Sequence, residues 1–180
     1  LGNVQTVVTT TAKSKAFADP DHPLPLIETV DDAAAETILA FMQLLVPAEN
    51  PSVYALCWRA GRNSIVREVY PIRKPSHPDA TSMGHPMVRI EKSGGGRWYT
   101  NVLLHWWDQG PTYRHLLVDG TTEPLRFYML EPQHGRGEYM VEMRNSRNVD
   151  VFAIKAEGDY NAFLIDRCSN LRVFGYAGNG

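Results

Sequence analysis

Three charged residues, Arg126, Asp150 and Arg172, recur at nearly equal distances along the chain and are the first candidates for chemistry. Leu103 holds the preceding position of the same series. A guanidinium group can neutralise an anion, and a carboxylate can take up or release a proton. On stacked parallel strands, about 4.8 Å apart, these charges also form a simple ladder of surface ion pairs, each worth at most about 1 kcal/mol. The sequence leaves both interpretations open.

A second charged series lies a few residues further along each repeat. It consists of Asp108, Glu131 and Lys155, with Glu157 beside it. This series could supply another acid or base to a reaction, or it could be a second ladder of ion pairs.

Aromatic residues are enriched between 98 and 128, and Trp106, Trp107 and Tyr128 are candidates for binding a sugar ring. One column of rings recurs with the repeat and consists of His105, Tyr128, Phe152 and Phe174. We expect this column to form an internal aromatic stack, with a sugar-binding platform as the alternative.

The histidines and cysteines show no metal-binding pattern. No HExxH motif occurs, and Cys57 and Cys168 lie far apart without a CxxC motif. We therefore predict no metal, no cofactor and no disulfide.

A repeat in the C-terminal half positions these candidates. Residues 140–158 superpose on 162–180, and the same frame carried backwards reaches 124–128 and then 101–105. Each copy alternates apolar and variable residues, as a strand with one buried face does. The two inward columns are Val102, Leu125, Val149 and Leu171, and Leu104, Phe127, Val151 and Val173.

The length of the repeat indicates the architecture. A period of about 22–24 residues is too short for a strand-helix-strand unit, and it is typical of a solenoid in which each coil is buried against its neighbours. Asn101, Asn148 and Asn170 recur at one turn position. Asparagine can adopt φ > 0 there and stack its amide on the next copy.

The N-terminal half is less regular. Strands are expected over 53–58 and 64–70. Residues 33–45 combine an acidic start with good helix formers, yet Leu44 precedes Val69 by about the length of one coil and is therefore in register for a strand. A helix over this segment and a strand over 38–46 remain alternatives.

We expect a single domain that is a fragment of a longer chain, with the possibility that the catalytic coils lie beyond Gly180. The four prolines of 71–86 predict a loop. The remaining segments are predicted as an irregular N-terminal part over 1–35, early coils or a capping helix over 36–72, and regular coils over 87–180.

Composition limits the class of protein. The 180 residues are 43% hydrophobic and 21% charged, as in a globular domain with a packed core, and the net charge of -2 argues against a general nucleic-acid binder. No apolar run is long enough to cross a membrane, so membrane insertion is not expected.

Two segments resemble a known family. Asn145–Val151 and Arg167–Val173 are similar to the coils of the right-handed parallel β-helix of pectin-lyase-like proteins, in which a Ser/Asn turn precedes an Asn-Ile-x-Ile-like strand. The resemblance covers residues 87–180 well and 36–72 loosely. It implies an all-β solenoid, and an exported protein of the periplasm or the extracellular space. An oligomer that forms through exposed coil edges is possible.

The resemblance also implies a function. Many such proteins act on polysaccharides, and we expect an acidic polysaccharide to be cleaved by lyase or hydrolase chemistry, with non-catalytic glycan binding or surface adhesion as the alternative. The paired-Asp signature of the hydrolases and the Arg-x-Pro-x-x-Arg motif of pectate lyases are both missing, so the specific activity does not transfer. The catalytic candidates are Arg126, Asp150, Arg172 and Lys155. The substrate-binding candidates are Trp106, Trp107, Tyr128, Glu131 and Glu157.

Overall fold

The computed structural model describes residues 6–47, 49–50, 52–74, 84–104, 110–158 and 160–179. In these ranges the chain is all-β, apart from one short 3-10 turn, η1, at Lys15–Phe17. No helix in them is long and apolar enough to cross a membrane. Several predicted features lie outside the described residues: His105, Trp106, Trp107, Asp108 and most of the loop over 71–86.

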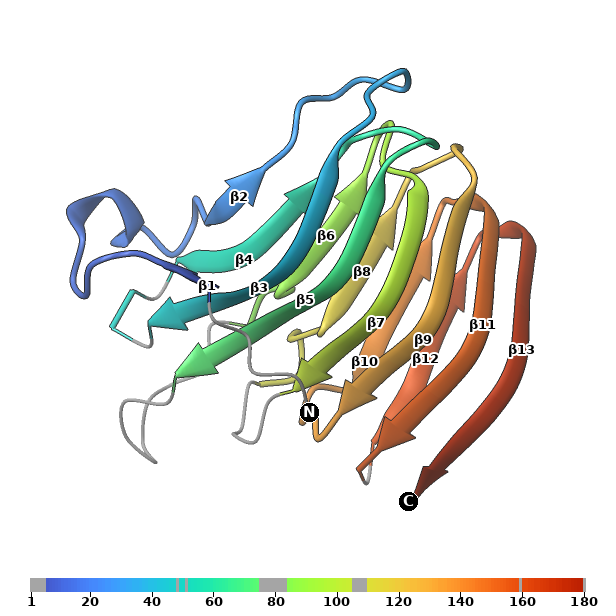
Figure 1. Ribbon diagram of the computed structural model, residues 1–180. Coiled ribbons are helices and arrows are strands. Elements are labelled where there is room, and N and C mark those ends of the chain that lie inside the picture. Colours follow the sequence, from blue (N-terminus) through green and yellow to red (C-terminus); the bar gives the residue numbers. More distant parts are fainter. Residues whose placement is uncertain are drawn as a thin grey trace.

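Two parallel sheets make up the fold, and consecutive strands alternate between them (Figure 1). The seven-stranded sheet contains β1 (Thr6–Thr9), β3 (Ile38–Pro47), β5 (Ile65–Lys74), β7 (Gly96–Leu104), β9 (Leu125–Gln133), β11 (Arg147–Glu157) and β13 (Ser169–Asn179). The six-stranded sheet contains β2 (Leu24–Glu28), β4 (Val53–Trp58), β6 (Val88–Glu91), β8 (Leu116–Asp119), β10 (Tyr139–Arg144) and β12 (Asn161–Asp166). Within each sheet the strands follow one another in chain order.

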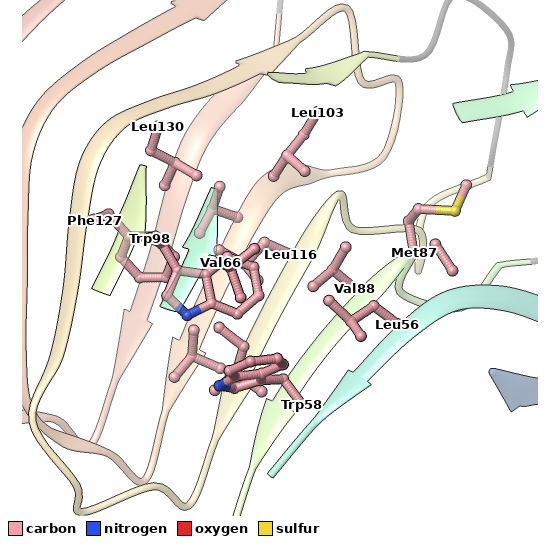
Figure 2. Packing of buried hydrophobic residues seen from close by; sticks show 14 of the residues in the cluster. Leu56, Trp58, Val66, Met87, Val88, Trp98, Leu103, Leu116, Phe127 and Leu130 are labelled. Atoms are coloured by element: carbon pink, nitrogen blue, oxygen red, sulfur yellow. The ribbon is translucent and has the colours of Figure 1, made fainter. Parts of the chain in front are cut away.

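The hydrophobic core lies between the two sheets. Trp58 of β4 and Trp98 of β7 meet edge to face at 5.6 Å between ring centroids, and Trp98 lies 5.6 Å from Phe127 of β9 (Figure 2). The indole N–H of Trp58 donates to the Gly95 carbonyl at 2.9 Å, so this ring is buried without losing a hydrogen bond.

The C-terminal part of the predicted repeat is confirmed by the strand register. Val149 of β11 lies opposite Leu125 on one side and Leu171 on the other, and Val151 is flanked in the same way. Leu125, Val149 and Val151 are fully buried. Val173 is 41% exposed because β13 is the outermost described strand of the sheet.

The first copy of the predicted repeat is wrong, because the corresponding residues lie earlier in the chain. Gly96, and not Val102, lies opposite Leu125, while Val102 lies opposite Glu131 and Leu104 opposite Gln133. The chain is therefore longer between Gly96 and Leu125 than between Leu125 and Val149, since a longer connection follows β7. A constant period cannot place a strand next to such an insertion.

Each long strand of the seven-stranded sheet bends at one residue with positive φ. These residues follow one another from strand to strand, and they are Phe41, Glu68, Thr100, Met129, Ala153 and Gly175. In this sheet the bend divides each strand from β3 onward into one arm before it and one arm after it. The side chain at the bend and the side chain just before it both lie on the outer surface. Only Gly175 adopts this conformation without steric cost.

Residues 38–47 form β3, so the strand alternative is confirmed and the helix is wrong. Pairing with β1 and β5 overrides the local helix preference. The register also differs from the prediction, because Leu44 lies opposite Pro71 and Met42 lies opposite Val69.

Two segment boundaries need correction. Residues 71–74 extend β5 and do not belong to a loop. The segment 1–35 is not irregular throughout, because it contains β1 and β2, which form by pairing with β3 and β4. Local sequence patterns do not reveal such short edge strands.

The asparagine turn is confirmed at two of its three positions. Asn148 and Asn170 have φ of 62° and 48°, and the Asn170 amide donates to Asn148 Oδ1 at 2.7 Å. Asn101 instead lies within β7, opposite Leu130, and is only 2% exposed. The shifted register of β7 explains this difference.

Candidate functional site

Four residues on the outer face of the seven-stranded sheet form what we call the charged row: Arg97, Arg126, Asp150 and Arg172. They lie opposite one another on β7, β9, β11 and β13, in the arm before the bend. The predicted neighbours Arg126, Asp150 and Arg172 are thus brought together. Leu103 is not a member, since it lies opposite Pro132 and is buried in the core.

Asp150 is at the centre of the charged row and is covered by its neighbours. Arg172 Nε donates to Asp150 Oδ1 at 2.7 Å and Arg172 Nη2 donates to Oδ2 at 3.0 Å. Arg126 Nε lies 3.7 Å from Oδ2. The hydrogen bond with Asp150 and the charge of its carboxylate raise the pKa of Arg172. Although the Asp150 side chain is only 7% exposed, it lies on the outer face beneath the two guanidinium groups.

Arg97 is the member that the sequence analysis missed. It is exposed, lies opposite Arg126, and forms no ion pair with any residue that the structure describes. The sequence does contain a signal for it: Arg97 precedes Trp98 and Tyr99, just as Arg126 precedes two aromatic residues. A shorter comparison window, without a fixed period, would have aligned these strands.

An aromatic row runs beside the charged row and consists of Tyr99, Tyr128, Phe152 and Phe174. Successive ring centroids are 4.9, 5.2 and 5.1 Å apart, and the ring planes differ by 12° or less. The predicted stack therefore forms, with Tyr99 as its first ring, but on the outer face instead of inside the protein. Stacked rings cover one another's faces and present their edges to solvent, so Tyr128 offers no flat platform to a sugar.

The second predicted group lies beyond the bend at Ala153. Lys155 Nζ is 2.8 Å from Glu157 Oε1, and this hydrogen bond raises the pKa of Lys155 and lowers that of Glu157. Glu131 accepts a hydrogen bond from Gln133 at 3.1 Å. Lys155 lies further along β11 than Asp150, on the other side of the bend, and belongs to a different cluster in which the charges compensate one another.

The six-stranded sheet carries an ionic ladder that the sequence analysis also missed. Arg59, next to β4, binds Glu91 at 2.6 Å and also contacts Glu28, and Arg144 binds Asp119 at 2.9 Å. The strands of this sheet are too short for a clear sequence pattern. Each of these two cations is bound to a carboxylate, so the ladder stabilises the sheet and presents no free cation.

Two buried titratable groups are structural. Burial raises the pKa of the Cys57 thiol to about 11, which keeps it from acting as a nucleophile at neutral pH. His115 Nδ1 accepts a hydrogen bond from the Tyr113 hydroxyl at 2.9 Å, and its Nε2 donates to the Gln133 carbonyl at 2.9 Å. Burial lowers the pKa of His115 to about 4. His115 is only 1% exposed, so it cannot meet a substrate.

Cys57 and Cys168 are both free thiols. In the part of the chain that the structure describes, no group of three or more His, Cys, Asp or Glu side chains is arranged to hold a metal ion.

The charged row is therefore the strongest candidate site, since it displays cations that are only partly neutralised by the fold. Known proteins offer no further guidance: no protein-family model matches the sequence, and no curated protein or solved structure matches it significantly.

Proposed function

We propose that the chain is a right-handed parallel β-helix, a solenoid of the pectin-lyase-like kind. Three observations support this architecture: the strict alternation of strands between two parallel sheets, the repeated bend at one residue per strand, and the stacked amides of Asn148 and Asn170. Each of them arises when every coil repeats the path of the coil before it.

We further propose that the charged row binds an acidic polysaccharide. The observation that carries this proposal is the projection of three guanidinium groups, Arg97, Arg126 and Arg172, from three of four adjacent strands, while the carboxylate on the fourth strand is covered. Strands in a sheet are about 4.8 Å apart, so the row extends for about 14 Å. Planar guanidinium groups match the geometry of carboxylate and sulfate groups.

A saccharide fits this surface better than a nucleic acid does. Proteins that hold single-stranded nucleic acids stack bases on exposed aromatic faces, whereas Tyr128 and Phe152 in the aromatic row are covered on both faces by neighbouring rings. The chain as a whole is also slightly acidic, with a net charge of -2. Such a partner belongs to a protein of the periplasm or the extracellular space, which is the location we propose.

Lyase or hydrolase chemistry at the charged row is the second candidate. It is favoured by the position of Asp150 between two guanidinium groups, because cations that neutralise a substrate carboxylate make the adjacent carbon more acidic. The Asp150 carboxylate is 7% exposed and each of its oxygens already accepts a hydrogen bond from Arg172, so a substrate could reach it only if the guanidinium groups above it moved. The geometry therefore supports binding of an anion better than transfer of a proton.

The test is a panel of acidic polysaccharides with neutral polysaccharides as controls, measured for binding, for new reducing ends and for absorbance of an unsaturated product. We expect salt-sensitive binding of acidic members only, and weaker, less salt-sensitive binding by Arg126→Gln. Equal affinity for neutral and acidic polysaccharides would contradict the proposal. New reducing ends or an unsaturated product would establish the second candidate.

A further inference from the structure

We propose that Asp150 is a positioning residue, which holds the guanidinium group of Arg172 in the orientation that receives the anionic groups of a polysaccharide. This inference rests on the proposed polysaccharide binding. It assigns Asp150 a role opposite to the one its charge suggests, since an acidic residue within an anion-binding surface would ordinarily oppose binding.

Arg172 is held by Asp150 through two hydrogen bonds. A guanidinium group has five N–H donors, and Asp150 uses two of them, one on Nε and one on Nη2. This paired contact fixes the plane of the guanidinium group and leaves three donors for a ligand. A long side chain that is already ordered loses less conformational freedom on binding than a free one does.

The two arginine side chains are more exposed than the carboxylate between them. Asp150 is 7% exposed, whereas Arg126 and Arg172 are 47% and 56% exposed. A ligand that approaches the sheet therefore meets the cations first, with the carboxylate beneath them. Val149 and Val151 are fully buried on either side along β11, which fixes the backbone that carries Asp150.

Arg97 provides an internal comparison. It belongs to the same row and carries the same charge, but it contacts no carboxylate among the described residues. If Asp150 orders Arg172, a substitution that keeps the positive charge should weaken ligand binding more at Arg172 than at Arg97, because only Arg172 has a paired contact with Asp150 to lose. Lysine makes this change, because its single ammonium group cannot form the two-point contact.

The experiment measures the affinity of the purified protein for the acidic polysaccharide that binds best in the panel. We expect Asp150→Asn to weaken binding at least fivefold, although it removes a negative charge. Asp166→Asn, on β12 of the other sheet, removes the same charge and should leave the affinity equal or slightly higher. Arg172→Lys should weaken binding at least fivefold, and clearly more than Arg97→Lys does, because only Arg172→Lys also removes the paired contact with Asp150.

The possible failures are distinguishable. If the wild-type protein binds no acidic polysaccharide, the proposed function is wrong and the role of Asp150 falls with it. If the wild-type protein binds and Asp150→Asn binds equally well or more tightly, only the positioning role is wrong. Should Asp150→Asn fail to fold, the comparison of Arg172→Lys with Arg97→Lys decides, and equal losses would overturn the proposal.

Discussion

Arg97 and Arg126 lie directly opposite each other on adjacent parallel strands, so that two guanidinium groups project side by side from one face of the sheet. Like charges in this relationship repel each other and destabilise a sheet. Asp150 contacts Arg126 on the side away from Arg97, so it offsets part of the charge of Arg126 without contacting Arg97. An arrangement that costs stability and lies on the surface is more readily explained by binding than by folding.

Arg97→Gln should therefore separate stability from binding. We expect the free energy of unfolding to rise by about 0.2 to 1 kcal/mol, because the repulsion from Arg126 is removed. Affinity for an acidic polysaccharide should fall at the same time. Chemical denaturation and a binding titration measure the two effects.

Arg172→Gln is the matched control for this change. It leaves the covered carboxylate of Asp150 with only the longer contact to Arg126, and it should lower the free energy of unfolding by about 1 to 2 kcal/mol. A stabilising effect of Arg172→Gln would show that the paired contact with Asp150 contributes nothing to the fold.

Asn101 provides a test of the core. It is 2% exposed, and among the described residues neither its side-chain oxygen nor its nitrogen has a hydrogen-bond partner. We expect Asn101→Leu, which has a similar volume, to raise the free energy of unfolding by about 1 kcal/mol, since the penalty for burying an unpaired amide disappears.

Asn50 is the control for Asn101, because it is equally buried but satisfied. Its amide nitrogen donates to the Thr11 carbonyl at 2.8 Å and its oxygen accepts from the Ser14 N–H at 3.0 Å. Asn50→Leu should therefore be destabilising by about 1 to 3 kcal/mol. Similar losses in both variants would mean that Asn101 is also satisfied in solution.

The pairing of the C-terminal strands was predictable because the spacing between β9, β11 and β13 is nearly constant. Arg126, Asp150 and Arg172 were found on that basis. Arg97 was not, because the chain takes a longer path from Ile65 to Arg97 and from Arg97 to Arg126, although these residues lie opposite one another. Insertions between paired strands leave the pairing intact, but they remove the period on which a sequence comparison depends.

The N-terminal part shows a different limit. Residues 33–45 favour a helix locally, and the strand at 38–47 exists because β1 and β5 supply hydrogen-bonding partners on both sides. Likewise, nothing in the sequence shows whether stacked rings face outward or inward, since that depends on the bends at residues such as Ala153. Such properties arise from pairing between distant strands and are not contained in a local pattern.

A single substitution tests whether Val149 is stacked between Leu125 and Leu171 in the core. Val149 is fully buried between Leu125 and Leu171, and Val149→Asp would place a carboxylate there without a partner. We expect a loss of more than about 4 kcal/mol, or insoluble protein. A soluble variant with unchanged thermal stability would contradict the register of β9, β11 and β13.

The stability of the protein should depend on pH through His115. Its pKa in the folded protein is about 4, below the ordinary value of 6.5, so the unfolded chain takes up the proton first. The contribution of His115 is fully present above about pH 6.5 and is lost as the pH falls towards 4. The expected decrease in the free energy of unfolding is up to about 3 kcal/mol.

Two variants isolate this contribution. His115→Gln should show a smaller decrease in stability between pH 6.5 and 4 than the wild-type protein, as measured by denaturation at a series of pH values. His22→Gln is the control, because His22 is exposed and its pKa is raised by the hydrogen bond with Asp19, so its effect has the opposite sign. If His115→Gln and the wild-type protein lose stability equally over this range, His115 is not the group responsible.

The extent of the charged row sets the length of ligand that it can hold. Arg97 and Arg172 are three strand spacings apart, so an acidic oligosaccharide must lie across the strands and span about 14 Å to contact both. Affinity measured with size-fractionated oligosaccharides should rise steeply up to that length and only slowly beyond it. In Arg172→Gln the steep part of the curve should end at a shorter length, because only Arg97 and Arg126 remain. An affinity that does not depend on the length of the oligosaccharide would show that the ligand contacts a single cation, and the row would then not act as one site.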